Sequence, residues 1–133
     1  MARIALVDDD RSFLAMMRDL MTLEGHQTLI QSRVDAAYAM ISKHRPDLVV
    51  TDLRLEHPEG GWMLLDRMRL DPRTANIPVI VCSDDTHRLA SAADYLREEG
   101  AWVLAKPFKV EQLIGLIEQL LDPERRPIAR SLV

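Results

Sequence analysis

IALVDDD, residues 4–10, passes from four apolar side chains directly into three aspartates. A short continuous apolar run of this kind is typical of a strand that is covered on both faces of a sheet. Because parallel strands need long crossover connections, the spacing between successive runs leaves room for one helix after each strand. We therefore expect five parallel strands, at 4–7, 28–30, 48–51, 79–82 and 103–105.

Amphipathic stretches separate these apolar runs. Within 12–24, apolar residues recur at helical spacing, and Gly25 is placed to end that helix in a left-handed conformation. Ser32 and Asp35 have the spacing of a capping box at the start of a second helix, which Pro46 stops. Three further helices are expected, at 62–70, 86–99 and 110–121. Together these elements predict an α/β protein with one open parallel sheet and helices on both of its faces.

The composition excludes several classes of protein. The chain has 133 residues, 47% of them hydrophobic, and no apolar run approaches the roughly 20 residues needed to cross a membrane. Its first segment reaches acidic residues too early for a secretory signal, so we expect a cytoplasmic protein. The single cysteine, Cys82, is expected to be a buried structural thiol. A net charge of −4 and scattered basic residues argue against direct binding of nucleic acid.

One domain is expected, because the length is close to the commonest size of a single domain. We assign 1–121 to this domain. The last residues, 122–133, are interpreted as a C-terminal tail or the start of a linker, since arginines cluster there beside prolines.

Polar residues collect where the expected strands end. In open parallel sheets, ligands bind at the carboxyl ends of the strands. If the first, third, fourth and fifth strands are neighbours, several carboxylates, a hydroxyl and an ammonium group converge on one small patch. The residues are Asp8, Asp9 and Asp10 after the first strand, Asp52 after the third, Ser83 and Asp84 after the fourth, and Lys106 after the fifth.

So many carboxylates need compensation. Two of them about 4 Å apart repel by roughly 4 kcal/mol at an effective dielectric near 20. The cluster must hold protons, pair with Lys106, or bind a hard divalent cation, and an all-oxygen site suits Mg²⁺. A carboxylate, Mg²⁺, a lysine and a hydroxyl are the groups that phosphoryl transfer requires.

Taken singly, each of these residues has a simpler interpretation. Asp10 is expected to cap the following helix, and Asp8 and Asp9 could be capping residues too. Asp52 and Ser83 could be turn residues, and Lys106 alone would be read as a surface lysine. Their convergence at one sheet edge favours a functional site.

Four segments follow one another along the chain: IALVDDD, PDLVVTDLRL, DPRTANIPVIVCS and LAKPF. In this order and at this spacing they resemble the site segments of response regulator receiver domains, the phosphorylation switches of two-component pathways. The resemblance extends from Arg3 to about Leu121. It implies a three-layer α/β/α, flavodoxin-like fold with the strand order 2-1-3-4-5. The first and fifth helices would cover one face of the sheet, and the second, third and fourth the other.

The resemblance also implies roles for the acids. Asp52 would accept a phosphoryl group from a phosphohistidine on a sensor histidine kinase or phosphotransfer protein, or from a small phosphodonor. Asp9 would bind Mg²⁺ directly, together with Asp52 and the backbone carbonyl of Arg54, and Asp8 would help mostly through water. The domain would assist its own phosphorylation and dephosphorylation, and it would be a signalling switch and not an enzyme with an external substrate.

Two further residues would respond to the phosphoryl group. Lys106 would pair with Asp52 and then hold a phosphoryl oxygen, while Ser83 would turn its hydroxyl toward the group after transfer. The bond between Lys106 and Pro107 would be cis. Phosphorylation would switch a surface formed by the fourth helix, fifth strand and fifth helix, where a downstream protein would bind. Formation of a homodimer is left open.

Several positions depart from the family's pattern. Val103 stands where an aromatic residue is common, and Trp102 either substitutes for it through a register shift or packs at the sheet edge. Asp84 stands where a small residue is usual, and its bulk and charge predict slow phosphorylation. Glu56 replaces a common proline in the loop LEHPEGG, while Gly60 keeps its place, so we expect a reshaped loop and an intact site.

Arg54 and Asp85 would flank the route of the water that hydrolyses an aspartyl phosphate. They either pair across the site and slow hydrolysis or form a solvated pair of little consequence.

Other functions remain as alternatives. The main one is a pseudo-receiver, an interaction module that works without phosphorylation, although its usual mark is the loss of an acid or of the lysine. An aspartyl-phosphate phosphatase would need a second aspartate where Arg54 stands, and a flavin protein a hydroxyl-rich loop where three acids stand. The four histidines lack the spacing of a zinc site. The short tail favours a stand-alone regulator if the chain is complete; otherwise the chain is the receiver part of a longer protein.

Overall fold

A computed structural model describes residues 1–122 and 124 of the chain. The predicted tail therefore lies almost entirely outside the described residues. Strands and helices alternate along the described part, and their bounds are β1 Arg3–Val7, α1 Arg11–Leu23, β2 Gln27–Gln31, α2 Val34–His44, β3 Leu48–Asp52, α3 Gly60–Leu70, β4 Val79–Ser83, α4 Thr86–Glu98, β5 Ala101–Ala105 and α5 Val110–Leu121.

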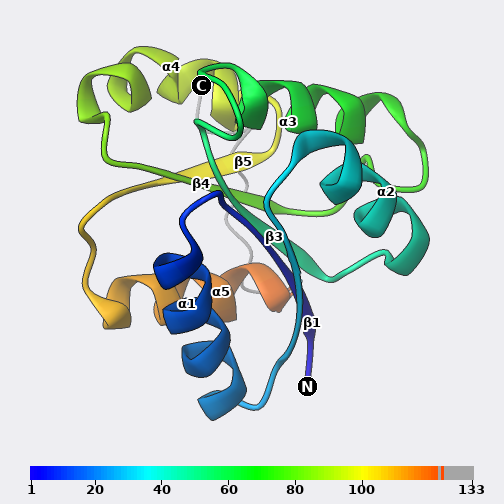
Figure 1. Ribbon diagram of the computed structural model, residues 1–133, viewed down its shortest axis with the longest axis vertical. Coiled ribbons are helices and arrows are strands. Elements are labelled where there is room, and N and C mark those ends of the chain that lie inside the picture. The colour runs from blue at the N-terminus through cyan, green and yellow to red at the C-terminus, as the bar shows by residue number, and fades with distance from the viewer. Residues whose placement is uncertain (123, 125–133) are drawn as a thin grey trace.

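All neighbouring strands are parallel, and the sheet has the order β2-β1-β3-β4-β5. Figure 1 shows α1 and α5 below this sheet and α2, α3 and α4 above it. The predicted fold class, strand order and distribution of helices are confirmed. β1 lies between β2 and β3, so its carboxyl end is close to the middle of the sheet edge.

Alternation along the strands divides the core into two hydrophobic clusters. In β1, Ile4 and Leu6 face α1 and α5, whereas Ala5 and Val7 face α2, α3 and α4. All four side chains are at most 1% exposed. A strand covered on both faces needs a continuous apolar sequence, which is why the strands could be recognised as unbroken runs.

Each strand is longer than its predicted range. β5 begins two residues earlier than expected, at Ala101, which pairs with Val79 of β4. The side chain of Trp102 is half-buried and packs against the α1/α5 cluster, so it is a packed tryptophan of an edge strand. Both added residues of β5 are apolar, so its apolar run was read two residues too short. β1, β3 and β4 each include a polar end residue, because strand pairing uses backbone groups.

Helix ends show which local signals were sufficient. Gly25 follows α1 with φ +83°, as predicted for a left-handed helix end. The capping box predicted from Ser32 and Asp35 is wrong. The residue before α2 is Arg33, whose side chain makes no capping hydrogen bond. The carboxylate of Glu56 accepts the Val34 N–H instead, across 22 positions of sequence.

Two further expectations concern the chain as a whole. Cys82 is 1% exposed, and burial raises the pKa of its thiol to about 12, so it is a structural thiol as expected. Among the described residues, no helix is both long and apolar enough to cross a membrane.

Candidate functional site

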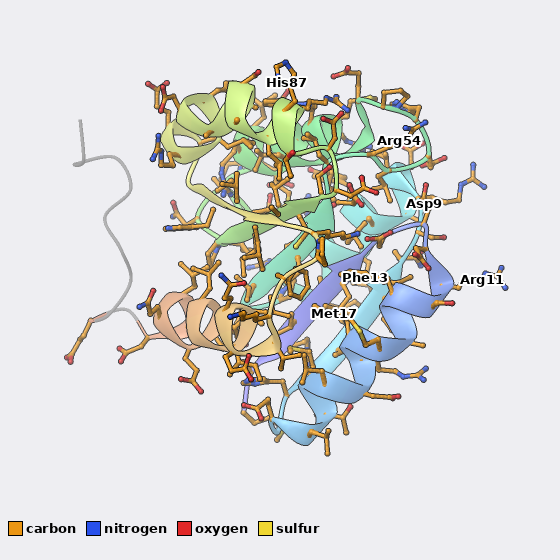
Figure 2. The ribbon with its side chains drawn as sticks, turned by 90° about the vertical axis from the view of Figure 1, so that its left-hand side faces the viewer. Asp9, Arg11, Phe13, Met17, Arg54 and His87 are labelled. Atoms are coloured by element: carbon orange, nitrogen blue, oxygen red, sulfur yellow. The ribbon has the colours of Figure 1, made fainter. Side chains whose placement is uncertain are left out.

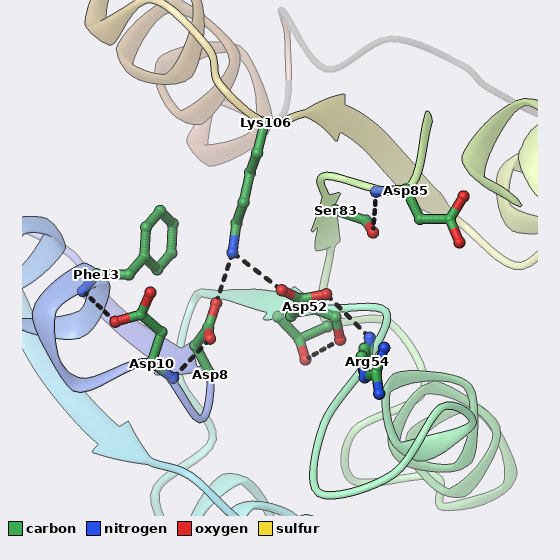
Figure 3. A network of polar contacts seen from close by, with 9 residues as sticks. Asp8, Asp10, Phe13, Asp52, Arg54, Ser83, Asp85 and Lys106 are labelled. Carbon is green, nitrogen blue, oxygen red and sulfur yellow. Dashed lines mark hydrogen bonds and ion pairs between the residues drawn. The ribbon is translucent and has the colours of Figure 1, made fainter. Parts of the chain in front are cut away.

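The sheet register brings the polar residues of four elements together. Val7 of β1 pairs with Thr51 of β3, so the residues that follow them, Asp8 and Asp52, lie side by side. Ser83 of β4 pairs with Ala105 of β5, so Lys106, the residue after Ala105, lies at the same edge. Figure 3 shows Asp8, Asp52 and Lys106 pointing toward one another across this edge.

Lys106 joins the two carboxylates. Its Nζ donates to Oδ2 of Asp8 and to Oδ2 of Asp52, both at 2.9 Å. The side chains are 3%, 14% and 18% exposed for Asp8, Asp52 and Lys106, so the three charges are largely shielded from water. The ammonium group also lies 3.9 Å from the ring centroid of Phe13. An aromatic face attracts a cation, so Phe13 helps to hold Lys106 in place.

Each carboxylate is also oriented by the backbone just after it. Oδ1 of Asp8 accepts the N–H of Asp10, and Oδ1 of Asp52 accepts the N–H of Arg54, both at 2.9 Å. One oxygen of each acid therefore contacts Lys106 and the other contacts the chain two residues later. This double restraint fixes the rotation of both carboxylates.

The protonation equilibria follow from this burial. Burial raises the pKa of Asp8 above its ordinary value, against the lowering effect of Lys106 and of the Asp10 N–H. Burial by itself lowers the pKa of Lys106, but its bonds to Asp8 and Asp52 outweigh that effect and raise the pKa. The lysine therefore stays cationic at neutral pH and compensates part of the negative charge.

Two glycines let α3 start directly beside Asp52. A side chain at Gly60 would place its Cβ 1.7 Å from the carbonyl oxygen of Leu55, and one at Gly61 would lie 2.2 Å from that of Asp52. The N–H of Gly61 donates to the carbonyl of Leu53 at 2.9 Å. In the loop after β3, Glu56 has φ +64°, and Gly60 lies against the backbone of Leu55. That this loop is reshaped relative to other members of the family stays a prediction.

The fourth strand contributes Ser83, which is 3% exposed. Its hydroxyl accepts the N–H of Asp85 at 3.1 Å, and the carboxylate of Asp85 caps α4 by accepting the N–H of Arg88. Figure 3 shows this side chain turned toward Asp85. Arg54 and Asp85 form no ion pair in the described structure, because Asp85 is engaged at the helix start and Arg54 is exposed.

A cavity of about 320 Å³ opens over this edge. Six aspartates and three basic side chains line it, an excess of three negative charges. The lining residues are Asp8, Asp9, Asp10, Phe13, Asp52, Arg54, Ser83, Asp84, Asp85, Arg88 and Lys106. All of the predicted site residues are thus brought together at this edge of the sheet.

The aspartates of the cavity differ in their roles. Asp10 accepts the N–H of Phe13 and caps α1, as predicted. Asp9 and Asp84 are exposed at the cavity, and Figure 2 shows Asp9 between β1 and α1, on the same side of the view as Arg54.

The described residues contain no ready-made metal site of side chains alone. Within residues 1–122 and 124, no three histidine, cysteine, aspartate or glutamate side chains converge tightly enough to hold a metal ion. A divalent cation here would therefore need water and backbone carbonyl ligands as well as carboxylates.

Sequence reasoning missed two residues of this site. Phe13 was counted only among the apolar residues at helical spacing within 12–24, and Arg88 was not singled out. Arg88 lines the cavity and pairs with Glu59 at 3.1 Å. The position of Phe13 in the first turn after three acids was a usable signal, whereas the Arg88–Glu59 pair joins residues 29 positions apart.

Comparison with known proteins agrees with this geometry. The family model of the response regulator receiver domain matches residues 4–118. The chain belongs to this family. Receiver domains of this family are the signalling switches of two-component systems. The peptide bond between Lys106 and Pro107 in this receiver domain is cis, as the resemblance implied.

Some relatives are much longer than this domain, and others have about its length. The chain is 33% identical over 129 residues to the DNA-binding transcriptional regulator NtrC of Rhizobium meliloti, covering 95% of the chain and 25% of the relative. The chain thus spans only a quarter of that regulator's length. A putative response regulator of Chloroflexus aurantiacus has a TM-score of 0.80 at 26% identity, covering 90% of this chain and 97% of that one.

A third comparison concerns the fold alone. The receiver domain of a sensor histidine kinase from Pseudomonas aeruginosa PAO1 has a TM-score of 0.78 at 20% identity, with 90% of this chain and 97% of that chain covered. That structure has a magnesium ion coordinated in the active-site cleft.

Proposed function

We propose that this receiver domain accepts a phosphoryl group on Asp52 in a Mg²⁺-dependent step. The donor would be a phosphohistidine on a sensor histidine kinase or phosphotransfer protein. The main observation behind the proposal is the placement of Lys106 Nζ at 2.9 Å from both Asp8 and Asp52. A cation that already bridges the acceptor and its neighbour is positioned to hold the charge that develops on a transferring phosphoryl group.

The chemistry of the cavity fits Mg²⁺. The atoms that could bind a metal ion are carboxylate and carbonyl oxygens, and the net charge of the lining side chains is negative. Mg²⁺ commonly keeps several water ligands beside one or two carboxylates. Asp9, Asp52 and the backbone carbonyl of Arg54 would hold the ion, with Asp8 acting mostly through water. When bound, the ion would neutralise negative charge between the carboxylates and the phosphoryl oxygens. The magnesium-containing kinase receiver domain supports this assignment by analogy of fold.

The chain's own residues would then divide the work. Asp52 keeps its Oδ1 on the Arg54 N–H, so the carboxylate is oriented before a donor arrives. Attack on phosphorus by a carboxylate oxygen forms the acyl phosphate bond as the bond from phosphorus to the histidine nitrogen breaks. Lys106 would hold a phosphoryl oxygen after exchanging its contact with Asp52. Ser83 would leave the Asp85 N–H and turn its hydroxyl toward the same group.

Output would come from a surface change, with α4, β5 and α5 as the region that a downstream protein meets. Ser83 is the last residue of β4, and Lys106 follows the last residue of β5. Both are therefore close along the chain to this surface. We also propose 1–121 as the extent of the domain, since the family match ends at 118 and α5 ends at Leu121.

Intact-mass measurement tests the proposal. The protein is incubated with a small phosphodonor, with and without Mg²⁺, and weighed. We expect the mass of one phosphoryl group to be added in wild type with Mg²⁺, and no addition in Asp52→Asn or without the ion. Failure of wild type to gain mass from a small donor and from phosphorylated histidine kinases would reject phosphorylation and favour a pseudo-receiver.

A further inference from the structure

Glu56 lies in the loop between β3 and α3, four residues after Asp52, and its backbone has φ +64°. This left-handed conformation is uncommon for a residue with a side chain and costs free energy. The loop around it is tightly folded, because the N–H groups of Leu55 and Gly60 both donate to the carbonyl of His57. Leu55 is completely buried and anchors the loop in the core.

The Glu56 side chain leaves this loop and reaches α2. Its Oε1 accepts the N–H of Val34, the first residue of the helix, and its Oε2 lies 3.3 Å from Nε of Arg33. The amide of Val34 is part-buried, and the side chain of Arg33, the residue before the helix, does not cap it. A carboxylate at this position satisfies an unpaired N–H and lies favourably at the positive end of the helix dipole.

This contact restrains the loop that carries the site. The N–H of Arg54, two residues before Glu56, donates to Oδ1 of Asp52. The orientation of the Asp52 carboxylate and of the Arg54 carbonyl therefore depends on the path of the loop backbone. The loop is held to the core by Leu55, to α3 by the Gly61 N–H on Leu53, and to α2 by Glu56.

We propose that Glu56 is a positioning residue of the phosphorylation site, which holds the Asp52 and Arg54 ligands in a geometry that binds Mg²⁺ by tethering their loop to α2. This inference rests on the proposed function. It goes beyond helix capping, because a cap would stabilise α2 alone. A tether would also set the affinity for Mg²⁺, whose ligands Arg54 and Asp52 lie two and four residues before Glu56.

The test separates the tether from the cap. Glu56→Ala removes both. The double variant Arg33→Asp, Glu56→Ala places a capping aspartate directly before α2 and so restores the cap without the tether. Mg²⁺ affinity is measured by calorimetry and by the shift of the Arg54 amide resonance, and stability by thermal unfolding. Neither readout requires phosphorylation.

We expect Glu56→Ala to lower the melting temperature by about 4 °C and to weaken Mg²⁺ binding by about tenfold. The double variant should recover the melting temperature and keep the weakened Mg²⁺ binding. Glu56→Gln retains an acceptor for the Val34 N–H and should bind Mg²⁺ with an affinity closer to wild type. If Glu56→Ala does not fold, the Mg²⁺ affinity of the double variant is compared with that of wild type.

His57→Ala is the matched control, since His57 is the next residue of the same loop and its side chain is exposed. It should leave Mg²⁺ affinity unchanged. Recovery of Mg²⁺ binding in the double variant, or unchanged binding in Glu56→Ala, would overturn the inference and leave the proposed function intact. Absence of Mg²⁺ binding in the wild-type protein would overturn both.

Discussion

The interior of β1 and the first residue beyond its carboxyl end are buried to a similar degree and differ in chemistry. In β1, Leu6 and Val7 are each 1% exposed, and the next residue, Asp8, is 2% exposed. Burial of the apolar pair favours folding, whereas burial of a carboxylate opposes it. Lys106 offsets part of that cost. The contrast shows that stability explains the residues within the strands and does not explain those at their ends.

The largest effect is expected in the interior. Leu6→Ala removes a side chain packed between β1 and the α1/α5 helices, and the resulting cavity should lower the free energy of unfolding by about 3 kcal/mol. Urea denaturation measures this change. A matched substitution on an exposed helix position, Leu23→Ala, should change stability far less, because Leu23 is 83% exposed. Equal losses at both positions would contradict the assigned core.

The second largest loss of stability is expected when Lys106, which pairs with both Asp8 and Asp52, is removed. Lys106→Ala leaves Asp8 and Asp52 buried together without their partner and should cost about 1 to 2 kcal/mol at neutral pH, given that the lysine is partly exposed. A carboxyl whose folded pKa is raised destabilises the protein above that pKa. The loss should therefore fade as pH falls toward 3.8, the ordinary value for Asp8. Denaturation at pH 7 and at pH 4 tests the sign, and a loss that grows toward acid would refute the explanation.

A smaller effect of opposite sign is expected at Asp8. Burial raises its pKa, so the unfolded state loses its proton more readily and stability falls as pH rises from 3.8. In buffer without divalent cations, Asp8→Asn should therefore stabilise the protein by about 1 kcal/mol at neutral pH. The gain should shrink in acid, where protonated Asp8 is also neutral. Asp9→Asn, at an exposed neighbour, should show no comparable gain.

The smallest effect on stability is expected at Asp84, where a substitution should instead change the rate of phosphorylation. Because Asp84 is exposed, Asp84→Ala should change the free energy of unfolding by less than about 0.5 kcal/mol. Its charge at the cavity repels an anionic phosphodonor, and a repulsion of about 1 kcal/mol corresponds to roughly fivefold in rate. Phosphorylation by a small donor should accelerate accordingly. Asp84→Asn separates charge from bulk, and no acceleration in either variant would contradict the prediction that Asp84 slows phosphorylation.

Apolar periodicity was enough to predict five strands with a helix after each one, in one open parallel sheet. The strand order and the distribution of the helices over the two faces were implied by the family resemblance, and they too agree with the structure. The cap of α1 by Asp10 was predictable because donor and acceptor are three residues apart. The cap of α2 was not, because Glu56 and Val34 are 22 positions apart and are brought together by the tertiary fold.

The amino-acid sequence by itself determined which strands end in charged or hydroxyl-bearing residues, and therefore the edge at which the site lies. It did so because strands and their ends are encoded by neighbours in the chain. The pairing of Lys106 with Asp52 was implied by the family resemblance. Only the tertiary structure decided that Lys106 also contacts Asp8, that the Phe13 ring lies beside its ammonium group, and that Glu56 reaches α2. Those contacts join residues 22 to 98 positions apart, and side-chain geometry over such separations depends on how the whole sheet twists and packs.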